Sequence, residues 1–510
     1  MQDPHLTGTN NYKWDYDGMG RKKKLTYPGG SPTEQWTYDS AGRLQTFINR
    51  DSKTQTFNYD ALNRLTYFTW TNNAAPRVDF GYDAASRLTT INNANATISR
   101  LYWYDNLFGA ETETITGGSA KTTMYYYDAD GNLDRFYMPG YTFQYQYTGR
   151  NQVSFIKDYS TGAQICHYVY DENGYTGDLT TRSFPNLTST TYQYDLLDRV
   201  THITHSLNIR DTRTLDYDYD SVGNRKWTKR DGGNGDVFRY DLADQANAVK
   251  VNIANPDTTP TPTANIAYDA NGNRTTFGPY GTTDTYVTNI LNQYTSRNNI
   301  NAQYDSKGNL TQGFDGSAYT FDAQNRLLTA SNMSFKYDGL NRQVSRTANG
   351  VTTYSVWDGW NLVQEYHMSG NSAVEDASYL YGATGLVKEL RNNRYYYQDG
   401  SGSTSHLASS NGTLLEWYRY DLQGTPVFYD ANNNQRNPNQ SAYGVRHLFT
   451  GQQWYSDIGL YDLRNRFYSP DLGRFLQPDP SGFDGDATNL YRYAGNNPVT
   501  YGDPSGEKAI

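Results

Sequence analysis

The sequence contains a single cysteine, Cys166, among 510 residues, so a disulfide framework or a cysteine-based zinc site cannot form within the chain. Basic residues are also scarce, because 44 Lys and Arg stand against 53 Asp and Glu, a net charge of −9. Nucleic acids and anionic membrane surfaces attract clustered positive charge, and this balance argues against both as partners. Of the seven His, only His202 and His205 are close. Three residues apart on a strand they face opposite sides, so no metal or cofactor site is predicted.

Long hydrophobic runs are missing as well. No stretch approaches the roughly 18 apolar residues of a membrane-spanning helix. Residues 1–12 are polar and lack the apolar core of a signal peptide. We therefore expect no membrane span. The chain is cytosolic as it stands, a piece of something longer, or secreted or displayed at the cell surface by a specialised export route.

What the chain has in abundance is tyrosine, with 49 copies, and glycine, with 45. Aliphatic residues are few for a globular protein, although Tyr, Trp and Val exclude a disordered chain. A tyrosine ring packs while its hydroxyl reaches water. This composition favours many thin layers, each partly solvated, over one large aliphatic core.

The tyrosines recur in a Tyr-Asp dipeptide pattern at intervals of 20 to 25 residues. The recurring tyrosines are Tyr38, Tyr59, Tyr82, Tyr104, Tyr127, Tyr147, Tyr170, Tyr194, Tyr219 and Tyr240. A self-similar period of this length indicates a stacked-repeat architecture. Such repeats build large surfaces or enclosures rather than a compact enzyme core.

One unit reads aromatic-x-Tyr-Asp-x-x-Gly/Asn-Arg-Leu, as in residues 57–65. Alternation before the Asp predicts a strand, and the Asp carboxylate can accept bonds from backbone amides further along the turn. Gly or Asn tolerates positive φ and closes the turn, after which the return strand begins. Each unit is therefore a β-hairpin, and the fold class predicted is all-β.

This repeat resembles the YD repeat of the RHS (rearrangement hot spot) family, over roughly residues 36–390. The family includes the C components of Tc insecticidal toxins, bacterial polymorphic toxins and the animal teneurins. The resemblance implies hairpins joined edge to edge into one long sheet that spirals into a hollow, barrel-like shell. It sets residues 1–390 as the repeat shell and residues 391–510 as a second domain.

The second domain has more specific motifs. It contains Gly459-Leu460-Tyr461-Asp462-Leu463-Arg464-Asn465-Arg466-Phe467-Tyr468-Ser469-Pro470, and two copies of Asp-Pro-Ser-Gly that begin at Asp479 and Asp503. This block is similar to the RHS repeat-associated core domain. In that family the domain plugs one end of the shell, and in many members it is an aspartic autoprotease that cuts just after itself.

Two carboxylates held close together share a proton, so that one can act as a base on water and the other as an acid. By the family's pattern the pair falls at Asp479 and Asp503, 24 residues apart, with a supporting arginine at Arg466. A guanidinium there could stabilise an oxyanion or orient a carboxylate. Asp-Pro-x-Gly is also an ordinary turn, so sequence alone leaves a purely structural role open.

The resemblance implies an encapsulating shell of the Tc or polymorphic toxin type, which houses a C-terminal toxic polypeptide and frees it by self-cleavage. Expected partners are that cargo, which this chain does not contain, and a delivery or secretion-system component or a toxin B component. Residues 507–510, Glu-Lys-Ala-Ile, depart from the apolar residue usual after the last Asp-Pro-x-Gly. The alternative is a cell-surface YD-repeat interaction protein that binds glycans or a partner cell.

Overall fold

The structure, a computed structural model, describes residues 11–30, 32–171, 176–208 and 211–509. Within these residues the chain is built of β-strands, with no α-helix. The helical segments found there are 3-10 turns of three residues, η2 (Thr71–Asn73), η3 (Pro256–Thr258), η4 (Phe449–Gly451), η5 (Gly482–Asp484) and η6 (Ala494–Asn496). No helix among the described residues is long and apolar enough to cross a membrane.

The first half of the chain forms one antiparallel sheet of 22 strands, in which each strand pairs with its neighbours in sequence. Its strands are β1 (Lys13–Tyr16), β2 (Lys22–Thr26), β3 (Thr33–Tyr38), β4 (Leu44–Ile48), β5 (Thr54–Tyr59), β6 (Leu65–Trp70), β7 (Val78–Tyr82), β8 (Leu88–Asn92), β9 (Ala96–Tyr102), β10 (Phe108–Ile115), β11 (Ala120–Tyr127), β12 (Leu133–Met138), β13 (Tyr141–Tyr147), β14 (Val153–Asp158), β15 (Gln164–Tyr170), β16 (Leu179–Ser183), β17 (Ser189–Tyr194), β18 (Val200–Asn208), β19 (Asp211–Tyr219), β20 (Arg225–Arg230), β21 (Asn234–Tyr240) and β22 (Ala246–Ala254). We call this sheet the wall.

Four smaller antiparallel sheets follow the wall along the chain. The first two contain β23 (Ile266–Tyr268), β24 (Arg274–Phe277), β25 (Asp284–Thr288), β26 (Tyr294–Arg297) and β27 (Ile300–Asn301), then β28 (Gln303–Tyr304) and β29 (Leu310–Gln312). The third contains β30 (Tyr319–Phe321), β31 (Leu327–Ala330), β32 (Met333–Tyr337), β33 (Gln343–Ala348), β34 (Val351–Asp358), β35 (Asn361–Ser369), β36 (Ser372–Gly382), β37 (Gly385–Glu389), β38 (Arg394–Gln398), β39 (Thr404–Ala408), β40 (Leu414–Tyr420) and β41 (Pro426–Asp430). The fourth contains β42 (Gln453–Tyr455), β43 (Leu460–Leu463), β44 (Arg466–Ser469) and β45 (Arg474–Phe475).

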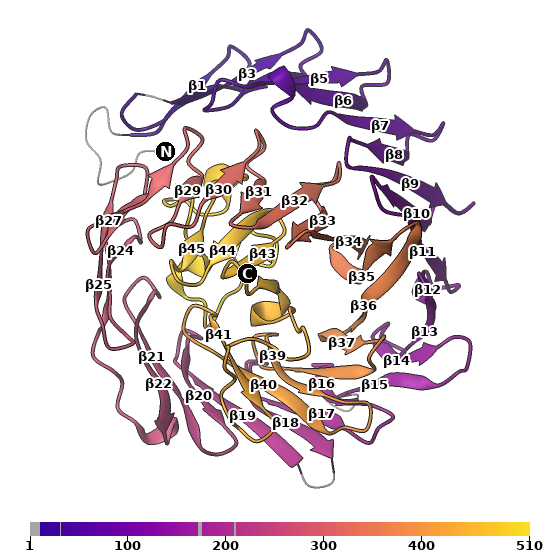
Figure 1. The fold of residues 1–510 in the computed structure, drawn as a ribbon, viewed down its shortest axis with the longest axis vertical. Helices are drawn as coiled ribbons and strands as arrows, with labels where there is room; N and C mark the ends of the chain where they lie inside the picture. Colours follow the sequence, from indigo (N-terminus) through magenta and orange to yellow (C-terminus); the bar gives the residue numbers. More distant parts are fainter. Residues whose placement is uncertain (1–10, 31, 172–175, 209–210, 510) are drawn as a thin grey trace.

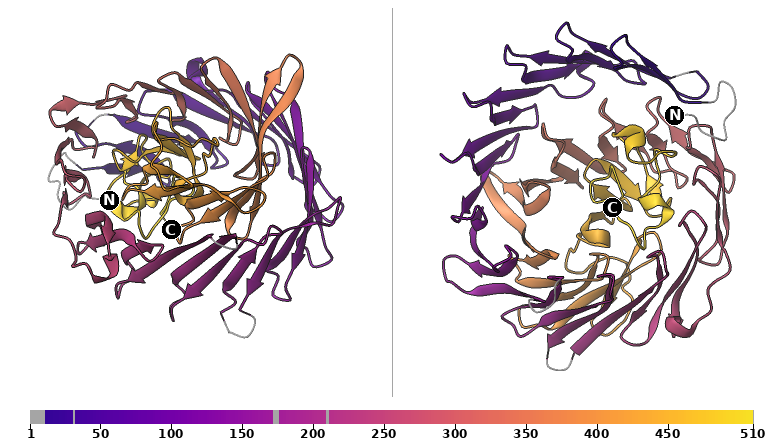
Figure 2. Two further views of the ribbon diagram at one scale, coloured as in Figure 1. Left: turned by 60° about the horizontal axis from the view of Figure 1, so that its bottom comes forward. Right: turned by 180° about the vertical axis from the view of Figure 1, so that it is seen from behind.

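The strands are arranged as an outer wall around an inner set. Figure 1 shows the wall curving around the later strands, with the C-terminal residues at the centre, and the two views in Figure 2 show the same nesting. The predicted all-β architecture of YD hairpins is confirmed. The hydrogen-bonded ladder runs without a break from β37 to β38, across the domain boundary at residue 390 predicted from the resemblance.

Most Tyr-Asp turns of the wall are closed by the Asp side chain, and in other turns Asn49 or Thr148 takes the same place. In the second unit, Asp60 Oδ1 accepts hydrogen bonds from the amides of Leu62 and Arg64 at 2.9 and 3.0 Å, while Oδ2 accepts from Arg64 Nε at 2.7 Å. Asn63 supplies the positive φ, 64°, that the turn requires. The Asp therefore satisfies backbone and side-chain donors at once, which explains why this residue and the Arg recur together.

Neighbouring hairpins are joined by the same side chains. Tyr59 Oη donates to the carbonyl of Leu44 at 2.9 Å, in the preceding unit. Arg64 reaches forward, donating to the carbonyl of Asp83 at 3.2 Å and lying 4.8 Å from the centroid of the Tyr82 ring. Each unit thus contacts the one before and the one after, and the pattern propagates along the wall as in other repeat proteins.

The wall is tied to the inner strands by buried charges and apolar packing. Arg342 lies between Asp338, at 2.7 Å, and wall residue Glu111, at 2.6 Å. Wall residue Arg182 donates to Gln398 Oε1 at 2.7 Å. The largest apolar cluster combines both layers, and its members include Phe143, Ile156, Val356, Tyr366, Val387 and Tyr397. The inner strands therefore cover much of the inner face of the wall.

Candidate active site

The structure brings the three site residues predicted from the sequence onto one point at the centre of the molecule. Arg466 opens β44, and its side chain is almost completely buried. Its Nη2 atom lies 2.8 Å from Asp479 Oδ2 and 3.3 Å from Asp503 Oδ2. The two carboxylate oxygens can therefore be no further apart than the sum of these two distances. This is the convergence that sequence alone could not establish.

The two Asp-Pro-Ser-Gly segments hold their carboxylates in the same way. Asp479 Oδ1 accepts from the amide and the hydroxyl of Ser481, at 2.8 and 2.5 Å. Asp503 Oδ1 accepts from the amides of Glu507 and Lys508, at 3.0 and 3.1 Å. In each turn Oδ1 is used locally and Oδ2 is left for the shared guanidinium, so both carboxylates are fixed in orientation.

Further contacts fix the orientation of the Arg466 guanidinium. Its Nη1 donates to the carbonyl of Leu490 at 3.0 Å, its Nε donates to the carbonyl of Gly506, and its guanidinium carbon lies 3.6 Å from the centroid of the Phe475 ring. Burial lowers the pKa of this guanidinium, while the carboxylates of Asp479, Asp503 and Glu507 raise it in opposition. The arginine thus sits as a fixed cation between two acids.

The surroundings of Asp479 raise the pKa of its carboxyl. Burial raises the pKa of Asp479 above its ordinary value, against the lowering effect of Arg466, and the neighbouring charge of Asp503 raises it further. A carboxyl with a raised pKa beside a second carboxyl is the arrangement that keeps one proton shared between two acids. Chemically, such a pair can supply an acid and a base to one reaction.

A peptide segment of the chain itself lies across the pair. Gly485 marks the position, because a Cβ on this residue would lie 2.2 Å from the carbonyl oxygen of Glu507 and 2.5 Å from Asp479 Oδ2. The amide of the next residue, Lys508, donates to Asp503. The amide of the Glu507–Lys508 bond thus contacts Asp503, and its carbonyl oxygen is no further from Asp479 Oδ2 than the sum of the two Gly485 distances. Sequence reasoning did not identify Gly485, since nothing in its local sequence Phe-Asp-Gly-Asp signals this contact.

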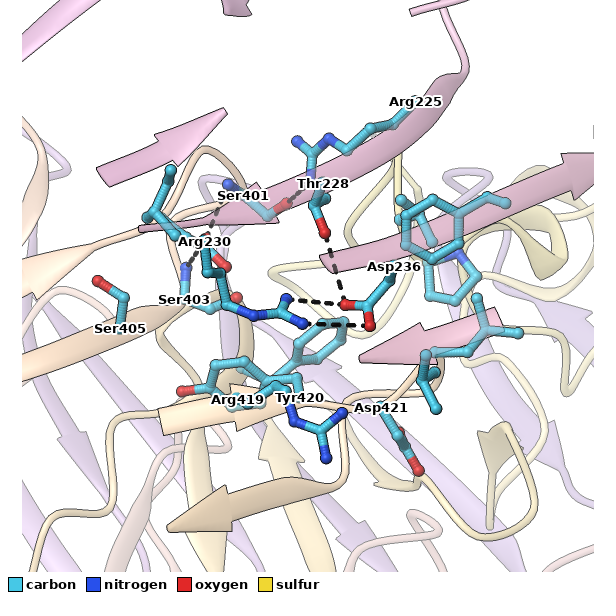
Figure 3. Close-up of a pocket in the computed structure, with 18 of the residues that line it drawn as sticks. Arg225, Thr228, Arg230, Asp236, Ser401, Ser403, Ser405, Arg419, Tyr420 and Asp421 are labelled. Atoms are coloured by element: carbon cyan, nitrogen blue, oxygen red, sulfur yellow. Dashed lines mark hydrogen bonds and ion pairs between the residues drawn. The ribbon is translucent and has the colours of Figure 1, made fainter. Parts of the chain in front are cut away.

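A separate small pocket, of about 90 Å³, lies between β19–β22 of the wall and the β38–β40 hairpins. Figure 3 shows its charged side chains interacting with one another: Arg230 donates to both oxygens of Asp236, at 2.8 and 3.2 Å, and Arg225 donates to Ser401 at 2.9 Å. Neither member of the aspartate pair lines this pocket. We interpret these contacts as a polar junction between the wall and the inner strands.

Comparisons with known proteins identify the class to which this architecture belongs. The family model Teneurin YD-shell matches residues 2–243. The tRNA nuclease WapA of Bacillus subtilis is 29% identical over 418 residues, 76% of this chain and 15% of that protein. The double-stranded DNA deaminase toxin A of Burkholderia cenocepacia is 29% identical over 223 residues, 37% of this chain and 15% of that protein.

Among solved structures, that of TcdB2-TccC3-Cdc42 superposes with a TM-score of 0.79 at 17% identity, over 97% of this chain and 28% of that one. The fold is that of the Tc toxin shell. The chain therefore has the fold of a YD-repeat shell, and it is similar to toxin-related RHS/YD-repeat proteins. It spans only a small part of the length of the relatives named here.

Proposed function

We propose that this chain is part of a toxin shell that encloses a C-terminal polypeptide and frees it by hydrolysing the Glu507–Lys508 bond. One observation supports the cleavage most directly. The amide nitrogen of the candidate bond lies 3.1 Å from Asp503 Oδ1, and its carbonyl oxygen lies, like Asp479 Oδ2, close to Gly485. Arg466 additionally holds the carbonyl of Gly506, one residue upstream.

The residues suit the roles of acid and base. In the proposed reaction Asp479 carries the proton and donates it to the Glu507 carbonyl oxygen, while Asp503 takes a proton from the attacking water. As the carbon–nitrogen bond breaks, Asp503 passes this proton to the nitrogen of Lys508, and Asp479 takes back a proton from one of the two hydroxyls on the carbon as the carboxyl forms. One water is consumed, and a carboxyl and an amine are formed. Because the base must be charged and Asp479 protonated, cleavage is expected to decline as the pH rises through the raised pKa of Asp479.

The partners follow from the relatives. The relatives named above include a tRNA nuclease and a double-stranded DNA deaminase toxin. Both are far longer than the region that they share with this chain. We propose that a cargo of this general kind follows the shell, that other toxin components complete the particle, and that the assembly acts outside the producing cell. Containment is the physical benefit, because an exposed unfolded cargo aggregates or is degraded.

The test is a chain extended beyond Ile510 by a small soluble domain of foreign sequence. Wild type should give two bands on a denaturing gel, with mass spectrometry placing the cut between Glu507 and Lys508. Asp479→Asn and Asp503→Asn should each leave one intact band, because an amide keeps the shape of the side chain but cannot exchange the proton.

The matched control is Asp457→Asn, which removes an exposed acid from the turn between β42 and β43 of the same block and should leave cleavage unchanged. If both active-site variants still cleave, the aspartate pair is not the catalyst. If wild type stays intact over the pH range in which Asp479 is protonated, the C-terminal block acts only as a structural plug.

A further inference from the structure

A large cavity borders the aspartate pair on the side of the wall. Its volume is about 680 Å³, within the roughly 300–1,000 Å³ usual for ligand pockets. One side is formed by the first hairpins of the wall, β1 to β6. The opposite side is formed by residues 478–484, the turn that carries Asp479 and Phe483. Whatever occupies this cavity therefore lies next to Asp479, one of the two acids of the pair.

The wall side of the cavity is a stripe of aromatic rings, one on each of several neighbouring strands. Trp14 and Trp36 have ring centroids 5.7 Å apart, Trp36 and Phe47 5.4 Å, and Phe47 and Trp70 6.2 Å. Trp14, Trp36 and Phe47 are only half buried, and all four rings line the cavity. Such spacing offers a row of separate contact sites for bulky side chains.

The same inner face is covered further along the wall. There Phe68, Val78 and Ile91 form one apolar cluster with Ala323 of the inner strands. The contact is so close that a Cβ on Gly339 would lie 2.5 Å from an Ile91 side-chain carbon. The inner strands therefore pack directly on the wall at β7 and β8. At β1 to β5 the two layers meet only in part, where Leu25 and Tyr27 cluster with Leu490 and Tyr491, and the cavity lies beside this contact.

Three buried polar atoms in the cavity lining have no hydrogen-bond partner among the described residues. Arg50 and Trp70 are at least nine-tenths buried, yet Arg50 Nε and Trp70 Nε1 have no hydrogen-bond partner among the described residues. Gln324 Oε1, an acceptor, also has no hydrogen-bond partner there. Two donors and one acceptor are thus left unpaired around one cavity, and each unpaired buried group costs free energy. A ligand with both carbonyl and amide groups has the acceptors and donors that these three groups lack.

The charges of the lining limit the class of ligand. Lys22, Arg50 and Lys307 stand against Glu34, Asp479 and Asp484, so the cavity carries no strong excess of either sign. Burial raises the pKa of Glu34 to about 7, which reduces its charge near neutral pH. A polyanion such as a nucleic acid finds no basic site here, whereas a neutral, mainly apolar ligand is well matched.

We propose that this cavity binds an extended polypeptide segment bearing aromatic or branched aliphatic side chains, adjacent to the Glu507–Lys508 bond. The rings take the side chains, and the unpaired groups of Arg50, Trp70 and Gln324 take the peptide backbone. Its assignment to the segment that follows the cleaved bond rests on the proposed autoproteolysis, but the binding of a polypeptide does not. A polypeptide is favoured over a sugar because Asp479, the acid that the proposed cleavage places beside a peptide bond, also lines the cavity.

The first experiment tests contact within one chain. Asp503→Asn keeps the chain intact while preserving an oxygen acceptor for the Lys508 amide. In this background the chain is extended beyond Ile510 by a ten-residue segment of alternating Phe and Ser, and Trp36 is replaced by the photocrosslinker p-benzoylphenylalanine. Light should join position 36 to the extension, as detected by mass spectrometry. The matched control carries the crosslinker in place of Trp103, which does not line the cavity, and should give no such product.

The second experiment uses the unextended protein and two free probes, the same ten-residue peptide and the sugar maltotriose. The peptide should shift the tryptophan fluorescence, and Trp36→Ala should weaken its binding at least tenfold while Trp103→Ala leaves it unchanged. Absence of both the crosslink and the peptide-induced shift would overturn the proposal, even if cleavage occurs normally. Binding of maltotriose but not of the peptide would overturn it in favour of a carbohydrate site. Failure of cleavage alone would count against the proposed function and not against this site.

Discussion

The wall and the C-terminal block both pair arginine with aspartate, with different consequences. In the wall, Asp60 and Arg64 form an ion pair whose side chains keep about a quarter of their surface exposed, 25% and 23%. In the block, Arg466 and its two aspartates expose only 2–3%. Exposed pairs contribute little to stability, whereas a buried pair that loses one partner leaves an uncompensated charge. The wall is thus a sum of modest repeated contacts, and the block depends on a few irreplaceable ones.

The sharpest way to test this contrast is Arg466→Ala. We expect a loss of about 3–5 kcal/mol in the free energy of unfolding, since the change leaves buried carboxylates unpaired, together with loss of cleavage in the extended chain. Urea unfolding and the gel assay measure the two effects. Arg466→Lys, which keeps the charge but not the forked geometry, should recover part of the stability without full cleavage. A cost below 1 kcal/mol for the Ala variant would contradict the contrast.

The next largest effect is expected for Gly485→Ala. The new Cβ would meet Glu507 O and Asp479 Oδ2 at 2.2 and 2.5 Å, so the peptide must move off the acids. Overpacking of this kind costs about 1–3 kcal/mol, and cleavage should slow at least tenfold. Gly149→Ala is the matched control, because its Cβ would have no atom within 4 Å. Equal effects of the two substitutions would show that the peptide does not depend on this close approach.

The wall also contains one acid, Glu34, whose ionised form is unfavourable in the fold. The substitution Glu34→Gln tests how this acid changes the free energy of unfolding with pH. Burial raises the pKa of Glu34 to about 7, above its ordinary value. The folded state therefore holds the proton more tightly, and this stabilisation is complete below about pH 4.5 and lost as the pH rises through 7. The Gln variant should match wild type in urea unfolding at pH 4 and exceed it at pH 8 by on the order of 2 kcal/mol. If the stabilities of the two proteins do not diverge between pH 4 and pH 8, the Glu34 carboxyl is solvated and its pKa is not raised.

The smallest effect is expected for Arg64→Ala in the wall. Removing this partly exposed pair should cost less than about 1 kcal/mol, with the far-ultraviolet circular dichroism of the strands unchanged. Thermal and urea unfolding give the measurement. A loss above 2 kcal/mol would mean that the ladder from Arg64 to Tyr82 is strongly cooperative, and the description of the wall as a sum of modest contacts would be wrong.

Sequence could predict whatever depends on neighbours along the chain. The YD turn is such a feature, since its Asp, Asn and Arg lie within five residues and bond to one another. The position of a given turn, in the outer wall or inside the molecule, cannot be predicted in this way. Asp338 and Arg342 form the same turn as Asp60 and Arg64, with an Oδ2 to Nε distance of 2.7 Å in both, yet the first pair is buried and the second is not. Only long-range packing decides which hairpins become wall and which lie inside.

The candidate site also combines features that local sequence predicts with features that only long-range packing determines. The Asp-Pro-Ser-Gly turns at Asp479 and Asp503 follow from local chemistry, and the family resemblance named Arg466 beside them. Their meeting on one guanidinium depends on how β44 and two distant turns pack, which no local pattern encodes. The aromatic cavity was not predicted at all, because Trp14 and Trp36 read as ordinary inward-facing strand residues until the inner strands are seen to leave them uncovered.

One further consequence follows from the way the YD turn is built. Its hydrogen bonds use backbone amides and the Asp and Arg side chains, so the side chains at the tip take no part in closing it. Three successive turns carry bare aliphatic tips, at Leu196 and Leu197, at Val222 and at Leu242. The rim of the wall is therefore free to diverge in evolution without disturbing the fold. A shell of this design can acquire new surface chemistry one turn at a time, while every hairpin beneath it stays the same.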